Sequence, residues 1–253
     1  MTTTDTRRPA ASRRCALDRG SAMRLAETEY SRYLDLLRAL EPGEWDLPTD
    51  CPAWTVREMA AHNLGMAEMA ASVRENLRQN REAGRRGGVF IDALTGLQVE
   101  ERRDMSPAEI VARYAEAGPR AARGRRRSPF LLRRLPMPVA QHVGGVQERW
   151  TFGYLVDTIL TRDPWMHRVD TARATGRGLV LTADHDGVLV ADVVAEWASR
   201  HGKSCTLTLA GPAGGHWTFG SGGPVVELDA VEFCRTLARR APGHGLLDVE
   251  VPF

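Results

Sequence analysis

The sequence contains almost no lysine, and its net charge is close to zero. Lys203 is the only lysine, so nearly all of the 34 basic residues are arginines. They are matched by 32 acidic residues, which leaves a formal net charge of +2. A balance this even gives no reason to expect a nucleic-acid-binding surface. The preference for arginine is typical of proteins from GC-rich genomes and suggests an actinobacterial origin.

Cysteine and long apolar runs are also scarce. The four cysteines (Cys15, Cys51, Cys205 and Cys234) show no C-x-x-C spacing, which argues against a disulfide framework and favours a cytoplasmic protein. No apolar run approaches the roughly 18 residues that a membrane helix needs. Residues 1–20 are polar and arginine-rich, so we predict a disordered tail rather than a secretory signal, with Met23 as an alternative start.

Apolar periodicity predicts that the first two-thirds of the chain is helical. The helices are expected to begin at Ser21, which could cap the first, and at two capping boxes, Thr55 with Glu58 and Ser106 with Glu109. Pro164 should kink or restart the last helix, because proline lacks a backbone donor. The predicted helices span residues 22–40, 56–82, 107–117 and 148–175, with a loop or short helix at 120–138.

The pattern changes after Gly178. A helix is predicted over residues 186–200, followed by strands at 205–209, 216–219 and 225–228 and a closing helix at 229–239. The fold class is therefore α with a small α+β C-terminal domain. We assign residues 21–178 to a helical domain and residues 179–253 to the α+β domain.

Three side chains that can bind a metal lie on apolar helix faces. His62 interrupts a stripe of methionines, and Asp163 and His167 are spaced D-x-x-x-H, one helical turn apart on one face. Two imidazoles and a carboxylate form an open three-ligand site suited to zinc. Alternatively, His62 is an ordinary core residue and Asp163 is the N-cap of a helix that restarts at Pro164.

Further polar residues near these three have two interpretations each. Asp170 could accept a hydrogen bond that orients a ligating imidazole, or it could pair with an arginine as part of the scaffold. The arginines between Arg123 and Arg134 form either a solvated segment or a site for an anionic substrate. Cys51 is expected to be a buried small residue.

Two segments resemble the DinB-like, mycothiol-dependent maleylpyruvate isomerase family. They are WDLPTDCPAWTVREMAAH at 45–62 and RDPWMHRVDTARATG at 162–176. A third stretch, WTFG at 217–220 followed by LDAVEFCRTLARR at 228–240, resembles the sterol-carrier-like domain that ends such proteins. The resemblance covers residues from about 22 to 253.

The resemblance implies a DinB-like four-helix bundle that holds one divalent metal, usually Zn²⁺, followed by a sterol-carrier-like domain. The family's ligands are a histidine on the second helix and a Glu-x-x-x-His pair on the fourth. His62 and His167 match those positions, whereas Asp163 replaces the glutamate and is one methylene shorter. The family's C-terminal domain tends to end in Gly-Arg, which makes Arg240 a candidate substrate or thiol contact.

These observations predict a metal-dependent enzyme with mycothiol as cosubstrate, acting as a cis–trans isomerase or thiol S-transferase on a small electrophile. We expect a monomer or homodimer without nucleic-acid or membrane partners; no catalytic residue is assigned. One alternative is a thiol-independent metalloenzyme of specialised metabolism (lyase, cyclase or hydrolase). Another is a non-catalytic small-molecule-binding module, suggested by Met59, Met66 and Met69.

Overall fold

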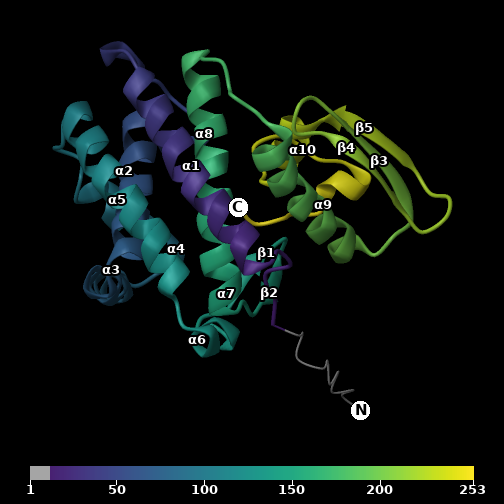
Figure 1. Ribbon diagram of the computed structural model, residues 1–253, viewed down its shortest axis with the longest axis horizontal. Helices are drawn as coiled ribbons and strands as arrows, with labels where there is room; N and C mark the ends of the chain where they lie inside the picture. Colours follow the sequence, from purple (N-terminus) through teal and green to yellow (C-terminus); the bar gives the residue numbers. More distant parts are fainter. Residues whose placement is uncertain (1–11) are drawn as a thin grey trace.

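The computed structural model describes residues 12–253, in a helical region followed by a smaller region that contains a three-stranded sheet (Figure 1). Of the tail predicted at residues 1–20, residues 1–11 lie outside the described part. Arg13 pairs with the main chain near Trp150, its amide donating to the Arg149 carbonyl at 2.8 Å. The first helix begins at Arg19, three residues earlier than predicted, and is capped by Asp18 rather than Ser21.

Four helices pack against one another and build the core of the helical region. Tyr33, Leu64 and Tyr114 are fully or almost fully buried between them, because each helix turns an apolar face inward. Both predicted capping boxes are present, at the starts of the second and third of these helices. The four are α1 (Arg19–Ala39), α2 (Val56–Ala71), α5 (Pro107–Arg127) and α8 (Leu160–Thr175).

The long helix predicted over residues 56–82 is instead two helices. Ser72 has extended backbone angles (φ −145°, ψ 122°), and its hydroxyl accepts from the Glu75 amide, so it ends α2 and caps α3 (Val73–Arg86). A further helix, α4 (Phe90–Glu100), was not predicted. The α3–α4 pair lies against α2, and this places α4 next to the metal-ligand candidate on α2.

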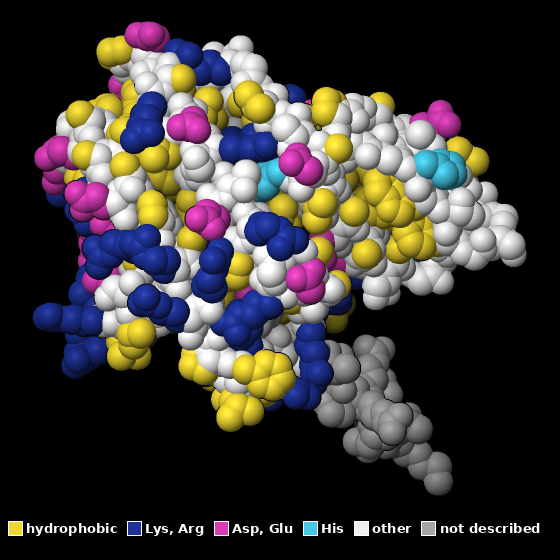
Figure 2. Space-filling view, in the orientation of Figure 1, with side chains coloured by type: hydrophobic (Ala, Val, Ile, Leu, Met, Phe, Trp, Pro, Cys, Tyr) yellow, Lys and Arg dark blue, Asp and Glu magenta, His cyan; other side chains and the backbone are white. Residues whose placement is uncertain are grey.

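The third helix is longer than predicted. α5 continues past Pro119 to Arg127, and α6 (Phe130–Arg134) follows in the segment predicted to be a loop or short helix. Arg125 is buried, while most arginines of this segment are exposed. Basic side chains gather over the lower part of the helical region, around α6 (Figure 2). A short hairpin, β1 (Gln141–Val143) and β2 (Val146–Glu148), leads to α7 (Phe152–Tyr154).

The last helix of this region continues through Pro164, where a remote arginine replaces the missing donor. Between α7 and α8 lies a π-helical turn at Leu155–Ile159. Pro164 cannot donate to the Leu160 carbonyl, four residues back; Arg125 Nη1 donates to that carbonyl at 2.8 Å. Asp163 is therefore inside α8, and its predicted alternative role as an N-cap is wrong.

The C-terminal region contains the predicted order of elements. A π-helical turn at Ala183–Gly187 leads into α9 (Val188–His201). The strands β3 (Cys205–Ala210), β4 (Gly215–Phe219) and β5 (Val225–Asp229) form a sheet of order β4-β3-β5, with β3–β4 antiparallel and β3–β5 parallel. α10 (Ala230–Leu237) closes the region. Among the helices of residues 12–253, none is both long enough and apolar enough to cross a membrane.

Candidate metal centre

His62 on α2 and the pair Asp163 and His167 on α8 meet at one place in the helical region. His62 Nε2 lies 3.5 Å from Asp163 Oδ2, and His167 Nε2 lies 3.3 Å from Asp163 Oδ1. One ligand atom from each of the three residues lies within 4.8 Å of the others. The capping box at Thr55 sets the start of α2, and with it the direction of His62.

These separations fit the coordination sphere of a small divalent ion. Two donors at about 2.1 Å from a tetrahedral zinc lie about 3.4 Å from each other. Oδ2 of Asp163 is also buried without a hydrogen-bond partner among the described residues, which is unfavourable for a carboxylate unless a cation satisfies it. The donor set and its spacing therefore fit a zinc-like ion with one coordination position left open.

Burial and charge act in opposite directions on these groups. Burial alone would raise the pKa of the Asp163 carboxyl, but the adjacent charges of His167 and His62 outweigh it and hold that pKa below its ordinary range. Burial would lower the pKa of His167, yet the Asp163 carboxylate and hydrogen bonds to Asp163, Asp170 and Cys51 raise it well above 6.5. The site strongly favours positive charge next to Asp163.

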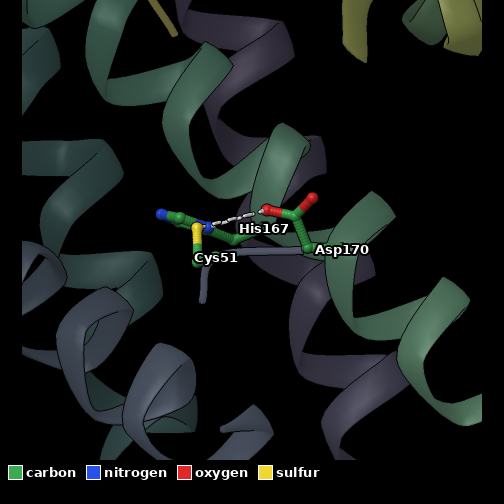
Figure 3. A group of neighbouring side chains, drawn as sticks. All are labelled: Cys51, His167 and Asp170. Carbon is green, nitrogen blue, oxygen red and sulfur yellow. Dashed lines mark hydrogen bonds and ion pairs between the residues drawn. The ribbon is translucent and has the colours of Figure 1, made fainter. Parts of the chain in front are cut away.

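Asp170 contacts both His167 and an arginine, which are the partners that its two predicted interpretations require. Its side chain is fully buried on α8, and Oδ2 lies 3.4 Å from His167 Nδ1 and 3.2 Å from Arg240 Nε. Cys51 comes from the loop before α2 and places its thiol beside the same ring (Figure 3). Cys51 is half-buried rather than buried, with Sγ 3.9 Å from Asp170 Oδ2.

Sequence reasoning missed two contacts of the candidate ligands. Gln98, on the unpredicted helix α4, lies with Oε1 2.8 Å from His62 Nδ1. The indole of Trp54 lies beside both imidazoles, with ring centroids 4.9 Å from His62 and 5.8 Å from His167. The sequence signal for Gln98 was an amide between the apolar residues Leu97 and Val99.

Arg240 lies where the C-terminal region meets α8. A cavity of about 420 Å³ is lined by Arg239, Arg240 and Asp248 together with the loop 241–243. Within residues 12–253, Nε is the only guanidinium nitrogen of Arg240 that donates to the protein. Arg239 has a left-handed backbone (φ 61°) just after α10, a position that usually requires glycine. The family resemblance implies a glycine at this position, where the chain has Arg239 instead.

A protein family and two solved structures match the chain. The family described as mycothiol maleylpyruvate isomerase N-terminal domain matches residues 26–172. A crystal structure of the mycothiol-dependent maleylpyruvate isomerase has a TM-score of 0.57 and 18% identity, covering 89% of this chain and 90% of that chain. A histidine-to-alanine mutant of that enzyme gives the same TM-score and coverage at 16% identity. At these identities the likeness shows a shared fold. No curated protein matches the sequence.

Proposed function

Because the chain belongs to the mycothiol maleylpyruvate isomerase N-terminal domain family, we propose that it is a metal-dependent enzyme that uses a low-molecular-weight thiol, with mycothiol as the expected cosubstrate. The observation that carries this proposal is the meeting of His62, Asp163 and His167 at separations that suit a tetrahedral ion. The helical region that supplies all three would act as the family's four-helix bundle, and the C-terminal region as its sterol-carrier-like domain.

The three side chains have the character that zinc requires. Imidazole and carboxylate both bind Zn²⁺ well, and three protein ligands leave the fourth position for an incoming group. When bound, zinc would lower the pKa of a thiol and keep it as a nucleophilic thiolate at neutral pH. Asp170 would hold the ring of His167 in place through Nδ1.

Arg240 is the residue that would bind an anionic part of the substrate or thiol. Its Nε is held by Asp170, which fixes the side chain, while the two Nη groups keep their donors for a ligand. A guanidinium fork matches a carboxylate geometrically. The adjoining cavity of about 420 Å³ is large enough for a small polar ligand.

The proposed reaction begins with addition of the thiol sulfur to an electrophilic carbon of an unsaturated substrate. If the sulfur leaves again after rotation about the carbon–carbon bond, the thiol is regenerated and the net reaction is cis–trans isomerisation. If the carbon–sulfur bond persists and the adjacent carbon takes up a proton, the product is a thioether. Both outcomes require the same bound nucleophile.

A thiol-independent metalloenzyme is the second candidate, and Asp163 favours it. The shorter carboxylate in place of the family's glutamate would change the space around the ion, and a fold does not fix a reaction. His62, Asp163 and His167 would then hold an ion that supplies Lewis-acid activation of water in place of the thiol.

One assay separates the two candidates. Zinc-loaded protein is incubated with a panel of cis-configured unsaturated carboxylates, with and without mycothiol, while substrate, isomer and free thiol are measured. We expect turnover only with the thiol, and its loss in His62→Ala. Turnover that is equal without thiol would support the second candidate, and no thiol-dependent turnover of any substrate would count against the first.

A further inference from the structure

A row of buried amides connects His62 to the surface of α3. Gln79 and Gln98 are both completely buried, Gln79 on α3 and Gln98 on α4. Gln98 Nε2 lies 2.8 Å from Gln79 Oε1, and Gln98 Oε1 lies 2.8 Å from His62 Nδ1. Glutamine has one accepting and one donating end, so each contact in the row constrains the next.

The outer end of the row fixes its direction. Gln79 Nε2 faces the Gly65 carbonyl at 3.1 Å and the Glu75 carboxylate at 2.9 Å. Arg78 hydrogen-bonds to Glu75 and lowers the pKa of that carboxyl to about 2, so both partners of Gln79 Nε2 only accept. The amide nitrogen of Gln79 must therefore point to them, which leaves Oε1 of Gln79 to accept from Gln98 Nε2.

The orientation of Gln79 also determines the orientation of Gln98 and the tautomer of His62. Gln98 donates through Nε2, so it presents Oε1 to His62, and Nδ1 of His62 has to carry the hydrogen. Nε2 of a neutral His62 is then left with its lone pair pointing toward Asp163. We propose that Gln98, anchored by Gln79, is a positioning residue that fixes His62 in the Nδ1–H tautomer and so presents Nε2 as a metal ligand.

Helix packing holds Gln98 in this place. Gly65 on α2 lies against the Gln98 side chain, and a Cβ at Gly65 would come within 2.6 Å of Gln98 Cγ. The missing side chain therefore lets the side chain of Gln98 approach α2, one turn from His62. Hydrogen-bond partners of this kind typically change metal affinity about 10- to 100-fold when removed. The metal part of this inference rests on the proposed function, whereas the tautomer does not.

The test combines the tautomer of His62 with zinc affinity. Metal-free protein carrying ¹⁵N-histidine is studied by NMR at a pH at which the two ring nitrogens of His62 show a neutral imidazole, and the His62 signals are assigned by their absence in His62→Ala. Zinc affinity is measured by competition with a chromophoric chelator. Gln98→Met removes the oxygen that accepts from His62 Nδ1 and keeps a side chain of similar volume. Leu97→Met is the matched control at the neighbouring buried position of α4.

We expect wild type to show His62 as the Nδ1–H tautomer. Gln98→Met should mix the tautomers and weaken zinc binding about 10- to 100-fold, while Leu97→Met changes neither. Gln98→Glu keeps an acceptor for Nδ1 and should preserve the tautomer, although it places a second oxygen opposite Gln79 Oε1 and should lower stability. A tautomer that changes in Gln98→Met but not in the less stable Gln98→Glu separates positioning of His62 from a purely structural role of Gln98.

Two results would overturn the inference. One is a wild-type His62 that is mainly the Nε2–H tautomer, which needs no variant to observe. The other is an unchanged tautomer in folded Gln98→Met. If wild type binds no zinc but shows the Nδ1–H tautomer, the role of Gln98 in fixing the tautomer stands and the proposed function fails. If zinc binds and the tautomer is Nε2–H, the proposed function stands and the inference fails.

Discussion

Arg240 donates a hydrogen bond from Nε to the carboxylate of Asp170, 3.2 Å away, across the boundary between the C-terminal region and α8. Asp170 is fully buried, and the same oxygen lies 3.4 Å from His167 Nδ1. One carboxylate therefore contacts both a candidate ligand-binding arginine and a candidate metal ligand. Loss of the contact between Arg240 and Asp170 would therefore change the surroundings of His167.

Arg240→Lys should weaken binding of the substrate or thiol without removing the metal. Lysine keeps the charge but lacks the fork that can hold a carboxylate while Asp170 fixes the side chain. We expect KM to rise about 10-fold or more, the range of a lost charged hydrogen bond, with zinc content unchanged. Steady-state kinetics and elemental analysis check this. A fall in zinc content at unchanged KM would instead limit Arg240 to supporting Asp170.

Wild type should carry about one zinc per chain, and His62→Ala and His167→Ala should each lose most of it. Each variant leaves only two of the three protein ligands, too few to hold zinc firmly. Asp163→Asn should weaken binding because it removes the only negative charge among the ligands, and Asp163→Glu, which restores the family's residue, should retain the ion. Elemental analysis after purification tests all four, and full occupancy in both alanine variants would contradict the site.

In the metal-free protein, His167 should titrate above 6.5. The Asp163 carboxylate favours the imidazolium more than burial opposes it, so the folded-state pKa is raised. A raised pKa stabilises the folded state fully below the unfolded value of about 6.5, and this contribution is lost as the pH rises through the folded value. An NMR pH titration of His167 in wild type and Asp163→Asn measures the effect. We expect the pKa to fall in the variant, and an equal pKa in both would be the contrary result.

Arg125→Met should lower the free energy of unfolding by about 1–3 kcal/mol. The guanidinium donates to the carbonyls of Val156 and Leu160, and methionine would leave both without that donor. Arg126→Met is the control, since Arg126 is exposed and pairs with Glu27 at the surface, where a pair contributes about 0–1 kcal/mol. Urea unfolding of both variants compares them, and equal stability would show that α8 tolerates Pro164 without Arg125.

The sequence predicted what depends on local rules. The D-x-x-x-H spacing places Asp163 and His167 on one helix face, and the capping box at Thr55 locates the start of the helix that carries His62. The alternating pattern of C-T-L-T-L identifies β3. These features follow from residue periodicity and helix capping within a few residues. They can therefore be predicted without knowing which other elements pack against them.

Features that depend on remote partners were not predictable in this way. α5 continues past Pro119, beyond its predicted end at residue 117. α8 continues through Pro164, where a kink or restart was predicted, and Arg125 from another helix donates to the carbonyl that lacks its usual partner. α4 follows a glycine-rich segment and contains Gly96, which hid the helix that carries Gln98. The role of Gln98 depends on a close approach to Gly65 that no local pattern encodes.

The candidate centre joins residues that are about a hundred positions apart in the chain. An ion held by α2 and α8 would act as a removable cross-link that closes this long loop, much as a disulfide restricts an unfolded chain. Chelation should then loosen the whole helical region rather than the site alone. The melting temperature would rise with free zinc concentration and so report the affinity of the folded state.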